Sequence, residues 1–273
     1  MKANVPRRGI VGTTLAITAM AGATLLSGSA TAGQDFAGPK PTILLVHGAF
    51  TDASSWSGVI TNLQHAGYPV VAPPNPLRDL TTDAAYIAGI TRNIKGPVIM
   101  VGHSYGGAVI TNAAREAPNV KGLVYVAAFA PDNGESTGDI NKRYPDTPIR
   151  TSIVPQLYPD GTVDLYIDPA KFRDVFAQDV PADRAAVMAA VQRPLNAPAG
   201  DRPSGEPAWK KLPSWFLTAT EDHAINPAAE ADMAKRAHAV QTVKIRGGHA
   251  LPVSHPNDVA RLIRTAACQT RQQ

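Results

Sequence analysis

The feature that most constrains this chain is an apolar run that ends in a serine between glycines. Residues 98–101 are apolar and mostly β-branched, and Gly-His-Ser-Tyr-Gly follows at 102–106, before a segment of small residues with a helical pattern. A strand, a tight turn and a helix with serine at the turn form a nucleophile elbow. Gly102 and Gly106 fit this turn because side chains there would clash with the neighbouring backbone. We therefore interpret Ser104 as a nucleophile.

The first 32 residues have the pattern of a secretory signal peptide. Positive charges, the last two at Arg7 and Arg8, precede a run of apolar and small residues at 10–26, and Ala-Thr-Ala at 30–32 matches an A-x-A cleavage site. We predict cleavage after Ala32 and a secreted or periplasmic location, with an uncleaved membrane anchor as the alternative. The arginine pair leaves both the general secretory route and the twin-arginine route open.

The remaining residues, 33–273, are enough for one large domain. Removing 32 of the 273 residues leaves 241, and it also removes three of the 26 Lys and Arg residues, which leaves a net charge of about +1 against 22 Asp and Glu residues. The chain has no basic run, so we expect no nucleic-acid partner, and we expect no stable membrane association. The single cysteine, Cys268, cannot form an internal disulfide.

Apolar, strand-like runs alternate with helical patterns along most of the domain. The strand-like runs lie at 42–46, 68–72, 98–101, 120–127, 213–220 and 241–245, and the helical patterns lie at 52–66, 82–94, 107–115, 227–237 and 257–267. This alternation predicts an α/β fold, a doubly wound and mostly parallel sheet with helices on both faces.

One long segment interrupts the alternation. Residues from about 130 to 211 are rich in proline and polar turns, with two short helical patterns at 169–178 and 181–192. This segment is too long for a plain connection between a strand and the next core element. We therefore predict an inserted helical cap at about 130–211.

A serine nucleophile needs a general base, and the base needs an acid that orients it. In folds with this elbow, the acid and then the histidine follow the serine along the chain. His249 follows two glycines in the loop after the strand predicted at 241–245, and we predict that it is the base. Asp222 directly follows an earlier strand and is the favoured acid, while its neighbour Glu221 and the more distant Asp132 stay open as alternatives.

The negative oxygen formed during acyl transfer needs hydrogen-bond donors. One donor is expected to be the backbone N–H of Tyr105, the residue after the nucleophile. The other is expected from the loop at 47–50, with the N–H of Ala49 favoured and that of Phe50 second. No H-E-x-x-H motif, paired Cys/His spacing or phosphate-binding glycine loop is present in the sequence, so we predict neither a metal site nor a cofactor.

Four motifs together resemble the α/β-hydrolase superfamily over about residues 41–267. They are His-Gly-Ala-Phe at 47–50, Gly-His-Ser-Tyr-Gly-Gly at 102–107, Ala-Thr-Glu-Asp at 219–222 and Gly-Gly-His at 247–249. The short cap, with Ser-Trp at 55–56 and Thr-Glu-Asp at 220–222, resembles bacterial esterases related to plant methylesterases and hydroxynitrile lyases. The resemblance implies an α/β-hydrolase fold, a catalytic triad of Ser104, Asp222 and His249, and oxyanion donors at Ala49 and Tyr105.

Departures from neighbouring branches narrow the expected reaction. Hydroxynitrile lyases of this group carry threonine at the position of Gly48 and lysine at that of Ala250, and dehalogenases and epoxide hydrolases use an aspartate nucleophile where this chain has Ser104. We therefore expect an exported serine esterase that acts on small-molecule esters without a cofactor. A lactonase, an amidase, a cofactor-free perhydrolase and a non-catalytic ligand-binding protein remain alternatives. Five apolar or aromatic residues in or next to the cap are candidate pocket walls: Phe129, Leu157, Tyr158, Phe172 and Phe176.

Overall fold

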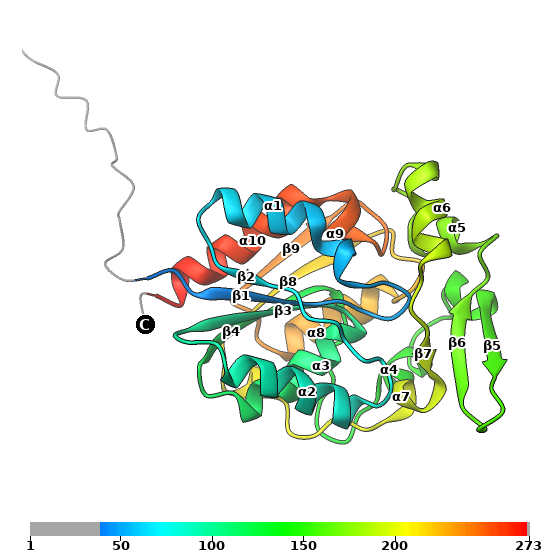
Figure 1. The fold of residues 1–273 in the computed structure, drawn as a ribbon, viewed down its shortest axis with the longest axis horizontal. Coiled ribbons are helices and arrows are strands. Elements are labelled where there is room, and N and C mark those ends of the chain that lie inside the picture. Colours follow the sequence, from blue (N-terminus) through cyan, green and yellow to red (C-terminus); the bar gives the residue numbers. More distant parts are fainter. Residues whose placement is uncertain (1–38, 272–273) are drawn as a thin grey trace, which may run out of the picture. The chain divides into compact units, whose positions relative to one another are not determined.

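Six parallel strands form the central sheet in the computed structural model, which describes residues 39–271 (Figure 1). The signal peptide predicted at 1–32 lies outside the described residues. Every neighbouring pair in the sheet is parallel, and the strand order is β2-β1-β3-β4-β8-β9. The strands are β1 (Thr42–Val46), β2 (Val70–Val71), β3 (Val98–Ser104), β4 (Val120–Ala128), β8 (Ser214–Ala219) and β9 (Gln241–Ile245).

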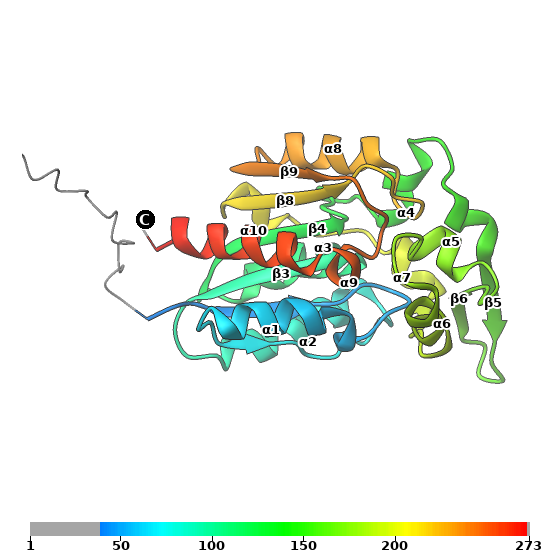
Figure 2. The same ribbon diagram turned by 90° about the horizontal axis from the view of Figure 1, so that it is seen from above.

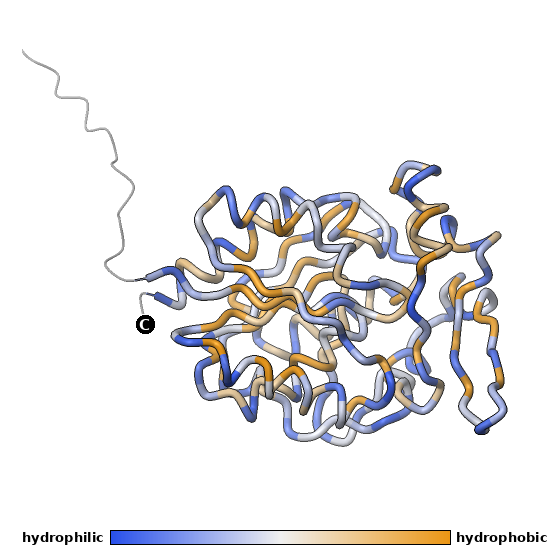
Figure 3. Tube along the Cα trace, in the orientation of Figure 1, coloured by the Kyte–Doolittle hydropathy of each residue, from blue (hydrophilic) through white to orange (hydrophobic). Residues whose placement is uncertain are grey.

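The central strands are buried on both faces, which explains their continuous apolar sequences. All residues of β1, β3 and β8 are buried. Because successive side chains of a strand point to opposite faces, Leu44 and Val46 pack into one hydrophobic cluster while Ile43 and Leu45 pack into another. The central strands accordingly carry long hydrophobic stretches, drawn in orange, in Figure 3.

Helices cover both faces of this sheet (Figures 1 and 2). One face carries α2 (Leu80–Arg92), α3 (Tyr105–Ala113) and α8 (Pro227–Arg236), and the other carries α1 (Ser57–His65), α9 (Leu251–Ser254) and α10 (Pro256–Gln269). The predicted doubly wound α/β fold is therefore confirmed. Within residues 39–271, no helix is both long and apolar enough to cross a membrane.

The segment between β4 and β8 contains more than the helices predicted for it. Its elements are α4 (Thr137–Lys142), β5 (Ile153–Leu157), β6 (Val163–Ile167), α5 (Phe172–Phe176), α6 (Ala182–Ala190), β7 (Leu195–Asn196) and α7 (Ala197–Asp201). The three strands pair antiparallel in the order β5-β6-β7, so a purely helical description of the cap is wrong in this respect. Figures 1 and 2 place β5, β6 and α6 beyond the carboxyl ends of the central strands.

The start of α8 is defined by local chemistry that also fixes the loop after β8. The Asn226 side chain accepts a hydrogen bond from the Ala228 N–H at 3.0 Å, and Pro227 occupies the first helical position. Both features are typical of helix starts, because a side-chain acceptor satisfies one free N–H and proline lacks an N–H to satisfy. These two residues therefore set where the loop after β8 ends and α8 begins.

Candidate active site

The sharp turn between β3 and α3 places Ser104 in a strained backbone conformation. Its φ is +53° and its ψ is −125°, a region that a residue with a side chain rarely adopts. A Cβ atom on Gly102 would lie 2.5 Å from the Gly106 carbonyl oxygen, and a Cβ on Gly106 would overlap the Val46 carbonyl oxygen. Both glycines are thus required by close backbone approach, and the strand–turn–helix geometry predicted around Ser104 is present.

The loop after β1 lies directly against Ser104. A Cβ atom on Gly48 would lie 2.6 Å from the Ser104 Cβ and 2.9 Å from the His103 carbonyl oxygen. His47 anchors this loop: its Nε2 accepts a hydrogen bond from the Asn75 N–H at 2.9 Å, so its proton lies on Nδ1 and is donated to the Gly48 carbonyl at 2.9 Å. Burial lowers the pKa of His47 to about 4, which keeps the ring neutral in this role.

His249 and Asp222 form a direct, buried hydrogen bond. The His249 Nδ1 and the Asp222 Oδ2 are 2.6 Å apart, and both side chains are almost fully buried. The other carboxylate oxygen, Oδ1, accepts the N–H groups of Ala224 at 2.6 Å and Ile225 at 2.8 Å. Three donors therefore hold the Asp222 carboxylate in one orientation, which in turn fixes the His249 ring with Nε2 as its free nitrogen.

The two alternative acids lie elsewhere. The Glu221 side chain is half exposed and pairs with Arg246, whose Nε is 2.7 Å from its carboxylate. The Asp132 carboxylate is 2.8 Å from the Lys210 Nζ. Their partners are surface cations, so among the three carboxylates weighed from the sequence, Asp222 is the one bonded to His249.

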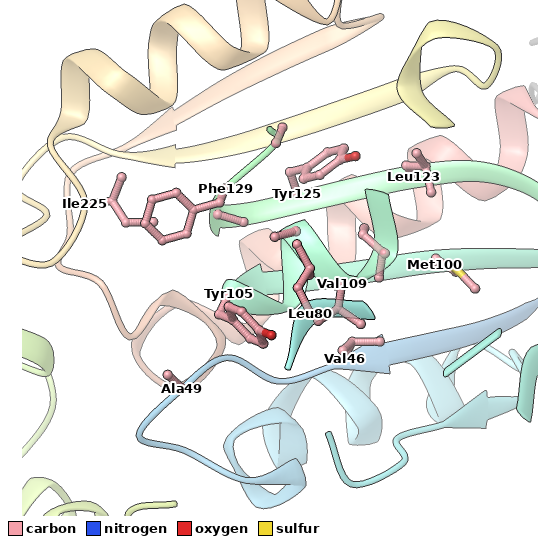
Figure 4. Packing of buried hydrophobic residues seen from close by; sticks show 14 of the residues in the cluster. Val46, Ala49, Leu80, Met100, Tyr105, Val109, Leu123, Tyr125, Phe129 and Ile225 are labelled. Carbon is pink, nitrogen blue, oxygen red and sulfur yellow. The ribbon is translucent and has the colours of Figure 1, made fainter. Parts of the chain in front are cut away.

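The two predicted oxyanion donors lie beside Ser104. Ala49 and Tyr105 line the same pocket as Ser104 and His249, and Figure 4 shows both at one end of the buried cluster of hydrophobic side chains. The N–H of Phe50, the second choice, is already donated to the Arg193 carbonyl at 2.8 Å. The Ala49 N–H has no acceptor within the described residues, so of the two N–H groups proposed from this loop it is the one that is free.

The Tyr105 side chain points away from its backbone N–H and ties α3 to α2. Its hydroxyl donates to the Asp83 Oδ2 at 2.9 Å, and both groups are buried. Burial raises the pKa of Asp83, and burial together with that carboxyl raises the pKa of Tyr105 well above its ordinary range. This hydrogen bond fixes the first turn of α3, whose N-terminus lies next to Ser104.

His103 contacts His249 through a hydrogen bond and a ring contact, a role that was not predicted from the sequence. Its Nε2 donates to the His249 carbonyl at 2.9 Å, and the two ring centroids are 4.8 Å apart. Burial lowers the pKa of His103 well below its usual range, so the ring stays neutral next to His249. Its position next to Ser104 in the motif was the available signal, but the contact depends on the fold.

A pocket of about 310 Å³ opens above Ser104 and His249. Of the five candidate wall residues, Phe129 and Phe176 line this pocket, whereas Leu157, Tyr158 and Phe172 do not. Leu157 is 72% exposed and Phe172 is fully buried within the cap, which explains why neither faces the pocket. The other apolar walls come from segments not singled out in the sequence: Ile149, Ile153, Leu165, Leu195 and Ile225.

Four charged residues also line the pocket: Lys142, Asp146, Arg150 and Asp201. Two of them, Arg150 and Asp146, pair with each other at 2.6 Å. The pocket lining therefore combines apolar and charged side chains. Within residues 39–271, no group of three or more His, Cys, Asp or Glu side chains could hold a metal ion.

Comparison with known proteins adds family membership to this geometry. The model of the "Alpha/beta hydrolase family" matches residues 43–262. The alpha/beta hydrolase nvfD of Aspergillus novofumigatus is 30% identical over 251 residues, which cover 84% of this chain and 97% of that protein. A pyrethroid hydrolase of Sphingobium wenxiniae is 26% identical over 244 residues, covering 81% and 85% of the two chains.

A solved structure shows the same fold. The crystal structure of polyneuridine aldehyde esterase matches with a TM-score of 0.73 at 17% identity, covering 84% of this chain and all of that chain. The family match over residues 43–262 and the similarity to a relative along nearly its whole length show that this chain belongs to the alpha/beta hydrolase family.

Proposed function

We propose that this protein is a serine esterase that hydrolyses small carboxylic esters. Family membership supports hydrolase activity, and the observation that carries the finer proposal is the 2.6 Å hydrogen bond between His249 and Asp222 in the pocket that also contains Ser104. Serine on an elbow, a neutral histidine and a buried carboxylate are the groups that nucleophilic acyl transfer requires.

In the first half of the reaction, Ser104 attacks the ester carbonyl carbon. The free Nε2 of His249 takes the proton of the Ser104 hydroxyl, and the Asp222 carboxylate stabilises the imidazolium that forms. The carbonyl oxygen becomes an oxyanion, which the N–H groups of Ala49 and Tyr105 stabilise. The tetrahedral intermediate collapses when His249 returns the proton to the alcohol oxygen, which leaves as free alcohol and yields an acyl-enzyme.

In the second half, water replaces the alcohol. His249 takes a proton from a water molecule, whose oxygen attacks the acyl carbon, and the same two N–H groups stabilise the second oxyanion. His249 then protonates the Ser104 oxygen, which releases the carboxylic acid. Because Asp222 keeps the Nδ1 proton of His249 in place, Nε2 serves as base and acid in turn.

The size and apolar lining of the pocket favour an apolar ester whose acyl or alcohol group is larger than an acetyl group. Phe129, Phe176 and Ile225 line it close to the reactive groups, and its volume is about 310 Å³. A relative is named as a pyrethroid hydrolase and another as a carbendazim hydrolyzing esterase. We therefore propose esters with apolar acyl or alcohol groups as substrates, ahead of highly charged ones.

A series of p-nitrophenyl esters from acetate to laurate tests this proposal. We expect turnover by the mature protein, with an optimum that reflects the pocket size, and a loss of several orders of magnitude in Ser104→Ala and His249→Ala. His223→Ala is the matched control, since His223 is bonded to the Asp174 carbonyl instead of to Asp222. A wild type that is inert towards this series, and towards matched lactones and amides, would contradict the proposal.

We also propose that the protein is exported, with residues 1–32 removed. The charge, the apolar run and the Ala-Thr-Ala site at 30–32 support this proposal. N-terminal sequencing of the protein recovered from the producing cell tests it, and we expect the mature chain to begin at Gly33. A chain that retains Met1 in the cytoplasmic fraction would refute it.

A further inference from the structure

A second buried carboxyl group lies behind the pair formed by Asp222 and His249. Glu230, in the first turn of α8, is only 1% exposed, although a glutamate near a helix start is normally solvated. Its Oε2 accepts a hydrogen bond from the Ala219 N–H at 3.1 Å, whereas its Oε1 is buried without a partner among the described residues. A buried carboxyl oxygen with no partner is costly, so this atom requires an explanation.

The partner available to this oxygen is the Asp222 carboxyl group. Ala219 ends β8 and Asp222 follows three residues later, and α8 packs against β8. The Glu230 carboxyl group, bonded to the Ala219 N–H, therefore lies on the side of the loop that carries Asp222, and besides burial a side-chain hydrogen bond to Asp222 is one cause of the raised pKa of Glu230. Two carboxylates have only acceptor atoms and cannot form a hydrogen bond. A contact of this kind therefore needs one proton, shared between Glu230 and Asp222.

The environment decides which carboxyl group holds the proton. Asp222 accepts two backbone N–H groups on Oδ1 and faces the His249 Nδ1 through Oδ2, so hydrogen-bond donors already face both of its oxygens. Glu230 has one N–H donor and a bare Oε1, and no cation pairs with it among the described residues. Arg236, farther along α8, is paired with Glu135 instead.

We propose that Glu230 is a positioning residue that remains protonated and donates its Oε1–H to Asp222, fixing the carboxylate that orients His249. This inference rests on the proposed function for its catalytic consequence, but the protonation itself does not. Asp222 then has a fourth donor, and its negative charge is held by hydrogen bonds on every side. Burial, with the charge of Asp222 as the second cause, raises the pKa of Glu230 well above its ordinary value, in agreement with this assignment.

A protonated Glu230 has a consequence for stability that does not involve catalysis. Above a pH of about 4.3 the unfolded chain loses this proton while the native protein keeps it, so the native state becomes less stable as the pH rises. The unfolding equilibrium constant then grows up to about tenfold per pH unit until Glu230 ionises in the native state. Asp222 is the titratable group that acts on Glu230 among the described residues, and His249 faces Asp222 from the opposite side.

Two substitutions separate the hydrogen bond from the charge. Glu230→Gln keeps a donor of the same length without an ionisable group, and Glu230→Leu keeps the volume without a donor. We measure urea unfolding of the full chain between about pH 5 and pH 9 for wild type and Glu230→Gln. We expect the variant to gain stability relative to wild type as the pH rises, with a ratio of unfolding constants that grows severalfold per pH unit.

Ester hydrolysis gives the catalytic readout. We expect Glu230→Leu to lose about tenfold in kcat with little change in KM, and Glu230→Gln to restore most of this loss. Wild-type activity should also fall at alkaline pH, where Glu230 ionises and repels Asp222, while Glu230→Gln should not show this fall. Glu221→Leu and Glu221→Gln are the matched controls at the exposed neighbouring carboxylate.

The possible results are distinct. A stability difference between wild type and Glu230→Gln that is independent of pH would show that Glu230 ionises normally, which overturns the protonated state. A kcat of Glu230→Leu equal to that of wild type would overturn the positioning role. A loss in Glu230→Gln as large as that in Glu230→Leu would show that the charge is required, which also overturns the proposal. An inactive wild type would refute the esterase assignment while the unfolding experiment still decides the protonation.

Discussion

Gly48 packs so closely against Ser104 that the substitution Gly48→Ala should displace the loop after β1. In Gly48→Ala, the new methyl group would lie 2.6 Å from the Ser104 Cβ and 2.9 Å from the His103 carbonyl oxygen. Ordinary contacts between carbon atoms are about 3.5–4.0 Å, so the loop after β1 must move by about 1 Å. Neither neighbour can yield, because one is backbone and the other is the first atom of a side chain on a strained turn.

This displacement falls on the residue next to Gly48, which is the proposed oxyanion donor Ala49. A displacement of about 1 Å removes a working hydrogen bond to the oxyanion, and the loss of one such donor lowers kcat by about 10²–10³-fold, or about 3–4 kcal/mol. The overpacked turn also costs about 1–3 kcal/mol in the free energy of unfolding. We therefore expect a large loss of kcat in a protein that remains folded at 25 °C.

The assay is steady-state hydrolysis of the best p-nitrophenyl ester, with urea unfolding in parallel. Gly89→Ala, in α2, is the matched control, because a Cβ there would lie 3.9 Å from its nearest neighbour. Removing a glycine from a helix interior stabilises the fold by about 0.5–1 kcal/mol, so the control should be slightly more stable and equally active. A folded Gly48→Ala variant with kcat within about threefold of wild type would refute the assigned oxyanion loop.

Three further predictions follow from the same contacts. Asp222→Asn should lower kcat by about 10⁴-fold, because the amide favours the wrong tautomer of His249. Glu221→Gln should leave kcat unchanged, and equal kcat values for the two variants would refute the choice of Asp222 as the acid. Tyr105→Phe leaves the buried Asp83 Oδ2 without its donor, so the free energy of unfolding should fall by about 1–3 kcal/mol in urea titrations. The kcat should stay within about threefold of wild type, because the backbone N–H of residue 105 remains. An unchanged free energy of unfolding would contradict this prediction. His47 has a pKa of about 4 in the fold against about 6.5 when unfolded, so the unfolded chain binds more protons between these two pH values. The free energy of unfolding should therefore fall by about 3 kcal/mol as the pH drops through this window. In urea unfolding, His47→Gln should flatten this pH dependence, and an equally steep dependence would contradict the assignment.

The core of the fold could be predicted from the sequence because its signals are local. The strands at 42–46, 98–104 and 214–219 contain the apolar runs 43–46, 98–101 and 215–217, and burial on both faces of a parallel sheet is the physical reason for such runs. The helix starts carry equally local chemistry, such as Asn226 followed by Pro227. These parts depend little on contacts with distant residues.

The cap could be predicted only in outline. Its hairpin strands, β5 and β6, are short and only partly buried, and β5 contains an internal proline, so they lack the buried run that marks the core strands. Leu157 is an example: the sequence made it a candidate pocket residue, but its side chain is exposed to solvent in the structure.

Residues of the candidate site could be proposed from the sequence, but the contacts that support them could not. Chain order and loop position favoured Asp222 and His249, with Glu221 and Asp132 as alternatives, and in the structure Asp222 and His249 are 2.6 Å apart. The choice of Ala49 over Phe50 as oxyanion donor depends on a hydrogen bond to Arg193, 143 positions away in the sequence. Glu230 reads as an ordinary acidic residue near a helix start, and only packing of α8 against β8 reveals that it is buried beside Asp222.

Covalent labelling of the nucleophile tests the central claim most directly. The mature protein is treated with a fluorophosphonate, which reacts with activated serines, and then analysed by intact mass and peptide mapping. We expect one adduct per chain on the peptide that contains Ser104, and no adduct in Ser104→Ala or His249→Ala. A wild type that hydrolyses esters without forming this adduct, or an adduct that persists in Ser104→Ala, would contradict the proposed mechanism.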